Sequence, residues 1–450
     1  KHSPYVFKPI LSRLFVKRPI AMMLLSRRLP AVLGAVALGT LTASVAALLA
    51  RRRKTKRHRA NTATRFGVST RGLRLNIPTS RIGGVIDFKD PFLEDSVRSL
   101  DSGDWVFMAL AENKLMLDVL RPRVIQALQR IPESLMSYVP MQGQVALRQS
   151  LSTFLERHVV KVPVQPNELV CMTGVSAILS NLFYCICEDG DSVLIPAPYY
   201  SAFDSDLSAF CNLQRVLVPL DSEAGYQLTV NALEAAYHKA QQTSGRDPKA
   251  VLLTNPHNPL GRISPREELE AILGWCTTKG MHLVSDEIYA LSTFGDRSWP
   301  SSPASDAVGS GPPPVGGQSF VSIAEVCGGK LSDHVHIMWS VSKDFGMAGV
   351  RVGVLWSKNS VLLEALRGAS KFTSVSGPTQ FLVTDLLADR NFVESYIIEN
   401  RKRLRESCEF LLHELDKLGI EYVMPAAGMF VWVDFWPLLA LLAVTRGGGA

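Results

Sequence analysis

The stretch from 335 to 351 is Val-His-Ile-Met-Trp-Ser-Val-Ser-Lys-Asp-Phe-Gly-Met-Ala-Gly-Val-Arg. Its apolar first part, Val335–Ser340, is typical of a buried strand. Lys343 follows almost at once, next to the hydroxyl residue Ser342, and Arg351 comes eight residues later. Because functional residues in open α/β sheets gather just past the carboxyl ends of strands, this stretch predicts a functional lysine at such an edge.

Short apolar runs recur around this stretch and alternate with amphipathic helical patterns. The other predicted strands are Leu169–Thr173, Ser192–Pro196, Val251–Thr254 and Met281–Ser285. A helix is predicted over Pro265–Gly280, with proline in its first turn and glycine as its stop, and another around 178–186. The alternation predicts an α/β fold whose large domain is a mostly parallel sheet with helices on both faces.

Polar residues follow two more of these strands. Asn258 lies in Asn255-Pro-His-Asn-Pro-Leu-Gly261, and Asp286 and Tyr289 lie in Ser285-Asp-Glu-Ile-Tyr289. Taken singly, Asn258 could only set turns and Asp286 could only cap a helix. Lys343 alone could be a solvated surface lysine. Their joint occurrence in chain order favours a shared functional site.

The residue types suit a carbonyl cofactor that carries a phosphate. A lysine buried among strand ends is desolvated, which lowers its pKa and makes it a competent Schiff-base nucleophile. An arginine with hydroxyl groups suits a phosphate dianion. Gly174-Val-Ser176 opens a helix, and the free N–H groups of a helix start can complete the phosphate site.

These motifs resemble the pyridoxal 5'-phosphate (PLP)-dependent aminotransferase class I/II family, of fold type I, and its 1-aminocyclopropane-1-carboxylate (ACC) synthase-like branch. The resemblance runs from about Trp105 to Phe435. It implies that Lys343 carries PLP as a Schiff base and is the catalytic acid and base, and that Asp286 holds a proton on the pyridine nitrogen. The other implied cofactor contacts are Asn258 and Tyr289 to the phenolate oxygen, Tyr200 on the ring face, and Val175 (backbone), Ser176, Ser340, Ser342 and Arg351 to the phosphate.

Two stretches carry the ACC synthase likeness. Ala109-Leu-Ala-Glu-Asn-Lys-Leu115 resembles the substrate-side segment of that branch, with Glu112 at its acidic position, and Pro196-Ala-Pro-Tyr-Tyr-Ser-Ala-Phe-Asp204 resembles its stacking segment. Glu112 could equally be an ordinary acid at a helix start, and Tyr199 and Tyr200 could be core residues.

The pattern departs from the family in two places. Met141 stands where the family has a tyrosine that reaches the cofactor of the neighbouring subunit, and Tyr138 is the possible substitute. After the predicted strand at 427–434, the chain ends without the expected arginine for the substrate carboxylate, since Arg446 has different surroundings. We therefore expect a small domain that is incomplete at the C-terminus, through truncation of the sequence or through loss of catalysis.

Four parts are expected along the chain: a basic arm at 1–86, a segment at 87–165 for the small domain and substrate side, the PLP-binding large domain at 166–370 with a loop insertion at 298–319, and a small-domain portion at 371–450. The expected function is transamination by a homodimer, with an amino acid and a 2-oxo acid as substrates. The alternatives are ACC synthesis or C–S β-lyase activity, and a membrane-tethered scaffold with impaired catalysis.

Charge separates the arm from the body. Residues 1–86 contain 18 Lys and Arg and no acid, whereas the remainder contains 30 basic and 41 acidic residues. An acidic body indicates no nucleic-acid partner. The seven cysteines form no C-x-x-C pair and accompany no histidine cluster, so no metal site is expected.

The arm contains an uncharged run at 31–50, which is long enough to cross a bilayer, followed by seven basic residues between 51 and 59. A single-pass anchor in that arrangement would leave the catalytic domain in the cytosol. The alternatives are a mitochondrial or plastid targeting peptide, for which an acid-free, Arg-rich start is typical, and a soluble or disordered arm.

Overall fold

The structure is a computed structural model that describes residues 69–75, 111–294 and 319–436. The uncharged run at 31–50, the greater part of the predicted insertion and Arg446 lie outside these residues. Within them, no helix has both the length and the apolar character that a bilayer crossing needs. The chain divides into two units at Leu73, and the short helix α2 (Thr70–Leu75) lies at this division. All further description concerns the second unit.

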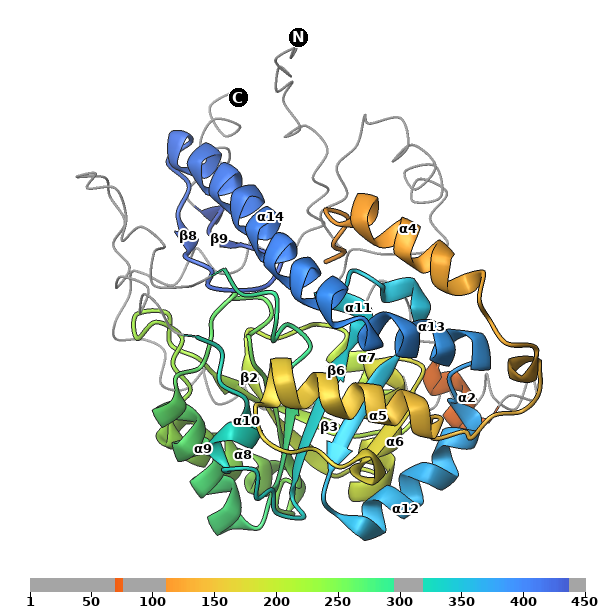
Figure 1. Cartoon of the computed structure of the whole chain (residues 1–450). Coiled ribbons are helices and arrows are strands. Elements are labelled where there is room, and N and C mark those ends of the chain that lie inside the picture. Colours follow the sequence, from red (N-terminus) through yellow and green to blue (C-terminus); the bar gives the residue numbers. More distant parts are fainter. Residues whose placement is uncertain (1–68, 76–110, 295–318, 437–450) are drawn as a thin grey trace, which may run out of the picture. The chain divides into compact units, whose positions relative to one another are not determined.

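A seven-stranded sheet lies at the centre of this unit (Figure 1). Its strands are β1 (Leu169–Met172), β2 (Ser192–Ala197), β3 (Gln214–Pro219), β4 (Ala250–Thr254), β5 (His282–Asp286), β6 (Val335–Ser340) and β7 (Gly353–Ser357). They are arranged in the order β1-β7-β6-β5-β4-β2-β3. The run from β3 to β6 is parallel, and β7 pairs antiparallel with both β1 and β6. The predicted mostly parallel sheet is therefore confirmed.

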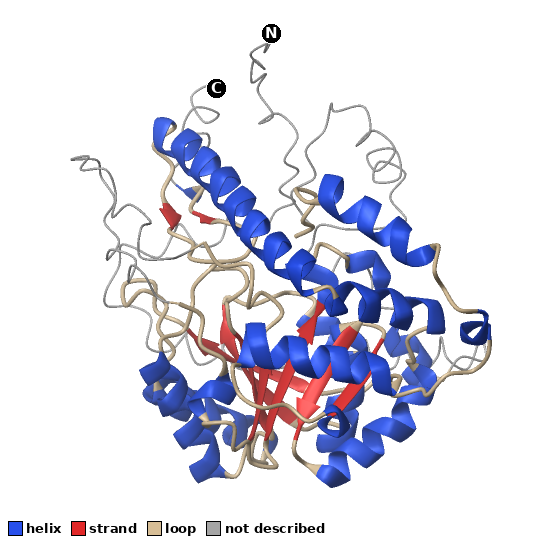
Figure 2. Ribbon diagram, viewed as in Figure 1, coloured by secondary structure: helices blue, strands red, loops and turns tan. Residues whose placement is uncertain are grey.

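Helices cover both faces of the sheet (Figure 2). The α-helices that the structure describes in this unit are α4 (Leu117–Leu128), α5 (Val145–Phe154), α6 (Val175–Ile186), α7 (Phe203–Ser208), α8 (Val230–Ser244), α9 (Arg266–Lys279), α10 (Ile323–Val326), α11 (Val341–Asp344), α12 (Ser360–Ala369), α13 (Gly377–Ala388) and α14 (Arg390–Lys417). Alternate strand residues enter two separate cores, because successive side chains of a strand point to opposite faces. Val251 and Leu253 of β4 pack with α5, α8, α9 and α13, whereas Leu252 packs with α6, α7 and α12.

The C-terminal part forms a third, smaller core. The second half of α14 packs against Phe294, Ile420 and the two-stranded sheet of β8 (Tyr422–Val423) and β9 (Trp432–Val433). This part meets the Asn258 loop at one residue: the Gly261 carbonyl accepts the backbone N–H groups of Ala426 and Ala427 at 2.8 and 3.0 Å. A side chain at Gly261 would come within 2.6 Å of Pro425 Cβ, so only glycine permits this close approach.

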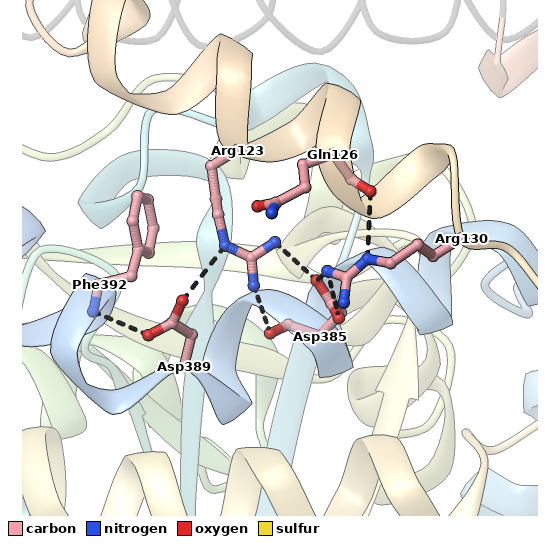
Figure 3. A network of polar contacts seen from close by, with 6 residues as sticks. All are labelled: Arg123, Gln126, Arg130, Asp385, Asp389 and Phe392. Atoms are coloured by element: carbon pink, nitrogen blue, oxygen red, sulfur yellow. Dashed lines mark hydrogen bonds and ion pairs between the residues drawn. The ribbon is translucent and has the colours of Figure 1, made fainter.

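Helix α4 is held against α13 and the start of α14 by an ionic network (Figure 3). Arg123 binds Asp385 through Nη1 at 2.6 Å and reaches Asp389 through Nε at 3.5 Å. Arg130, two residues past the end of α4, binds the same Asp385 carboxylate at 2.8 Å. Arg123 and Asp385 are both largely buried, and the network fixes the helix that follows the Glu112 segment.

Candidate active site

Lys343 lies on α11, directly after the carboxyl end of β6. Its side chain is half-buried, and Nζ donates a hydrogen bond to the Ala111 carbonyl at 2.6 Å. Burial lowers the pKa of Lys343; the charge of Arg351 adds to this, whereas those of Glu112 and Asp286 oppose it. Three predicted residues, Glu112, Asp286 and Arg351, are thus brought within electrostatic reach of one amine.

Asp286 ends β5, the strand next to β6 in the sheet, and its side chain is buried. Burial raises the pKa of Asp286 to about 7, and the nearby carboxyl of Asp206 raises it further, whereas the Ile288 N–H and Lys343 oppose the rise. A carboxylate in this setting is stabilised by a buried cation such as a protonated ring nitrogen. The position fits the role that the family resemblance implies.

Tyr289 and Asn258 come together as predicted. Tyr289 is buried, and burial raises the pKa of its hydroxyl group. A hydrogen bond from Asn258 opposes this rise. Its ring packs edge-on against Phe430 with centroids 5.2 Å apart. Tyr200 is exposed, and the charges of Asp206, Asp286 and Arg351 act on its hydroxyl group.

The predicted phosphate contacts converge where β6, β7 and the start of α6 meet. Ser340 pairs with Gly353 across β6 and β7. A Cβ on Gly353 would lie 2.8 Å from the Gly174 carbonyl carbon and 3.0 Å from the Val175 nitrogen, so the backbones are in close contact. Arg351 lies against Gly174, where a Cβ would clash with the Arg351 guanidinium. The free N–H groups at the start of α6 therefore lie beside the Arg351 guanidinium, and together they form a suitable anion site.

The two serines of the lysine motif differ in their freedom to bind an anion. Ser340 Oγ donates to the Val352 carbonyl at 2.7 Å and accepts from the Ser342 backbone N–H at 3.0 Å. The Ser342 hydroxyl lies 2.8 Å from Ser340 Oγ. Ser176, on the first turn of α6, is exposed toward solvent. Ser340 thus caps α11, and Ser342 has the freer hydroxyl group of the two.

The segment that carries Glu112 is tied to the lysine helix through two buried asparagines. Asn113 Nδ2 donates to Asn400 Oδ1 at 2.6 Å, and Asn400 Nδ2 donates to the Asp344 carbonyl at 3.3 Å. Glu112 itself is exposed. The arrangement holds the Glu112 carboxylate near Lys343 without burying it.

Two carboxyl groups of the site were not predicted from the sequence. Asp344, next to Lys343, is buried and accepts hydrogen bonds from Leu291 N, Ser292 Oγ and Trp339 Nε1. Asp206 of α7 hydrogen-bonds with Ser176, and its Oδ2 is buried without a hydrogen-bond partner. Asp344 could have been predicted from the sequence, because it follows the lysine directly. Asp206 could not, since only the fold brings α7 to α6.

The predicted substitute for the missing family tyrosine does not contact this site in the same chain. Tyr138 is 97% exposed, and Met141 is half-buried on the neighbouring loop. Among the described residues, no group of His, Cys, Asp and Glu has a metal-binding arrangement. Cavities of about 460 and 240 Å³ beside α5 are lined by other residues than those predicted for the site.

A lysine past a strand end, a buried carboxyl and an anion site in a mixed seven-stranded sheet define a fold-type-I PLP-dependent enzyme. The residues fit PLP, because the buried carboxyl of Asp286, the glycine-lined anion site and the partly desolvated amine of Lys343 match its ring nitrogen, phosphate and aldehyde. The chain belongs to the aminotransferase class I and II family, whose model matches residues 106–445. It is an ACC synthase-like member of that family, which uses PLP.

Curated relatives and solved structures agree with this assignment. The chain is 37% identical over 351 residues to 1-aminocyclopropane-1-carboxylate synthase 1 of Oryza sativa subsp. indica, covering 74% of this chain and 68% of that protein. It is 35% identical over 349 residues to the Malus domestica synthase, covering 74% and 69%. A Thermus thermophilus aspartate aminotransferase double mutant matches with a TM-score of 0.63 at 23% identity, covering 80% of this chain and 85% of that one, and shows the shared fold.

Proposed function

We propose that this protein binds PLP at Lys343 and transfers the amino group of an amino acid to a 2-oxo acid. The observation that carries the proposal is the setting of Lys343. Its amine has a pKa lowered by burial and lies within reach of Glu112, Asp286 and Arg351. A primary amine poised in this way can both hold a carbonyl cofactor and move a proton.

When bound, PLP supplies an electron-withdrawing ring that makes the substrate Cα proton acidic. Lys343, once freed by the substrate, would take the proton from Cα and return it, and burial, which lowers its pKa, favours the neutral amine that this role needs. Asp286 would hold a proton on the ring nitrogen, and Asn258 and Tyr289 would bind the ring oxygen. Tyr200 would stack on the ring. The residues that would hold the phosphate are Val175 (N–H), Ser176, Ser340, Ser342 and Arg351.

A second candidate reaction is formation of ACC from S-adenosylmethionine. It is supported by Glu112, whose charge acts on Lys343, and by the names of the relatives, which are ACC synthases. Product analysis separates the two. A new 2-oxo acid supports transamination, whereas methylthioadenosine with a cyclic amino acid overturns it; pyruvate with a released thiol would indicate β-lyase activity. Protein that holds PLP but turns over no substrate would support the scaffold alternative.

The family dimerises, and we propose a homodimer here. We also propose that the basic arm anchors the protein in a membrane with its catalytic domain in the cytosol, with targeting to a mitochondrion or plastid as the alternative. The support is the uncharged run at 31–50 and its basic flank. Full-length protein that is extracted without detergent after lysis would contradict the anchor.

The cofactor assignment is tested by the absorption spectrum of purified protein with PLP, before and after borohydride. We expect a visible band that borohydride converts into a stable adduct on Lys343, located by peptide mass spectrometry. Lys343→Ala should lose the adduct. Lys358→Ala is the matched control, because Lys358 Nζ binds the Gly329 carbonyl away from the site. An adduct that persists in Lys343→Ala would refute the assignment.

A further inference from the structure

Asp206 brings a second carboxyl group to the proposed cofactor site. It lies on α7, hydrogen-bonds with the Ser176 side chain and has a buried Oδ2 that no described group partners. Its charge acts on both Asp286 and Tyr200, so it lies near both residues. A buried oxygen without a partner is costly in free energy, which indicates that a proton or a ligand group satisfies it in the working protein.

The contact between Asp206 and Ser176 has a consequence for phosphate binding. A serine hydroxyl has one proton to donate. If Asp206 is ionised, it takes that proton, and the Ser176 oxygen then presents lone pairs to an approaching phosphate. If Asp206 is protonated, it donates to Ser176 instead, and the Ser176 proton is free for the phosphate. The Asp206 carboxylate and the phosphate therefore compete for the single proton of the Ser176 hydroxyl group.

We propose that Asp206 is a positioning residue that must take one proton from solvent before Ser176 can donate its hydroxyl group to the phosphate of PLP. The inference rests on the proposed function and deepens it, because it makes cofactor binding depend on protons at a residue that does not touch the cofactor. No bond other than the O–H of the Asp206 carboxyl forms or breaks.

The surrounding charges set the pH range of this effect. Burial raises the pKa of Asp206 to about 6 in the cofactor-free protein, although the Ser176 hydrogen bond opposes the rise. The neighbouring carboxyl of Asp286 and the ring of Tyr200 face it, and Arg351 acts on Tyr200. On α7 itself, Asp204 is occupied by Tyr199 and Arg215.

A phosphate dianion adds negative charge and raises the pKa of Asp206 further. This rise in the pKa sets the direction in which cofactor affinity changes with pH. Well below pH 6 the carboxyl already carries its proton, so binding takes none up. Above pH 6 and below the raised pKa, uptake through Asp206 approaches one proton, and affinity falls by up to about tenfold per pH unit.

The test uses pyridoxamine 5'-phosphate, which carries the phosphate but cannot bond covalently to Lys343. Calorimetric titration of cofactor-free protein in buffers of different ionisation enthalpy, at about pH 7.5, gives the number of protons taken up. We expect Asp206→Asn to take up nearly one proton fewer than wild type and to bind roughly tenfold more tightly, because its amide donates to Ser176 at any pH. Pyridoxamine without phosphate should show no such difference, which excludes a proton linked to the ring nitrogen.

Asp204→Asn is the matched control on the same helix and should bind as wild type does. The gain from Asp206→Asn should be much smaller in combination with Ser176→Ala. An equal gain in both backgrounds would mean simple charge repulsion and would overturn the proposal. If Asp206→Asn does not fold, Ser176→Ala alone must still lower proton uptake. Unchanged uptake in either variant overturns the Asp206 role only, whereas wild type that binds no pyridoxamine 5'-phosphate overturns the cofactor assignment as well.

Discussion

The buried carboxyl of Asp286 has opposite effects on function and stability. Its pKa is raised to about 7 by burial, far above the ordinary value of an aspartate. A raised folded-state pKa means that the unfolded chain ionises first, so the stability associated with this group is complete below about pH 4 and is lost as pH rises to about 7. Bound PLP would reverse this effect, because its protonated ring nitrogen would stabilise the ionised form of Asp286.

Asp286→Asn should therefore stabilise the cofactor-free protein near pH 8 by about 4 kcal/mol and have little effect near pH 4. The same variant should reduce turnover at least about a hundredfold, because its amide does not hold a proton on the ring nitrogen. Urea unfolding of both cofactor-free proteins at the two pH values checks the first part. Equal stability differences at both would show that Asp286 is not ionised by pH 8.

At the residue scale, the site was predictable where chemistry follows a strand in the sequence. Lys343, Asp286 and Asn258 each lie a few residues past a predicted strand, and the structure brings them together. Asp206 was not predictable, because it lies beyond Tyr200 on a short helix and meets Ser176 only through the packing of α7 on α6. The assigned roles remain predictions until they are tested.

Among the elements, the buried strands were predicted best. Residues 335–340 match β6 from end to end, because its side chains are buried on both faces. Strand β3 was missed, since it is an edge strand with exposed positions and a weak apolar pattern. Strand β7 was also missed, because it follows the lysine motif closely and no helical pattern in the sequence separates it from β6. Pro265 proved to be the cap that precedes α9, one position before its predicted place in the first turn.

The prediction for the elements concerns the ionic network that holds helix α4 against α13. Asp385→Ala should lower the free energy of unfolding by about 3 kcal/mol, because it leaves the largely buried Arg123 without its 2.6 Å partner and also releases Arg130. Asp389→Ala is the comparison. It loses a 3.5 Å contact and the cap on the Phe392 N–H, and should cost about 1 kcal/mol. Chemical denaturation of both variants measures the difference, and equal costs would contradict the importance of the Asp385 network.

At the scale of the whole molecule, one segment exposes many large apolar side chains. Those between 125 and 145 are Ile125, Leu128, Met136, Tyr138 and Val145. Monomeric proteins rarely leave so many together in water. Because Met141 lies in this segment, at the position where the family reaches the neighbouring cofactor, we propose that it forms part of the dimer interface.

Met136→Glu should therefore raise the dissociation constant of the dimer at least about tenfold, because a charge would be buried at the interface. Phe410→Glu, at an exposed apolar position on α14, is the matched control and should leave association unchanged. Sedimentation over a range of protein concentrations measures both. A Met136→Glu variant that associates as wild type does would place the interface elsewhere.

The contact at Gly261 links two distant parts of the chain. Its carbonyl receives two N–H groups from the C-terminal part, three residues after the Asn258 that we assign to the ring oxygen of PLP. A shift of the C-terminal part would pull on the Asn258 loop and alter the hydrogen bond to that oxygen. Since the same bond tunes the electrons of the ring, the colour of the bound cofactor would serve as an optical gauge of the position of the C-terminal part.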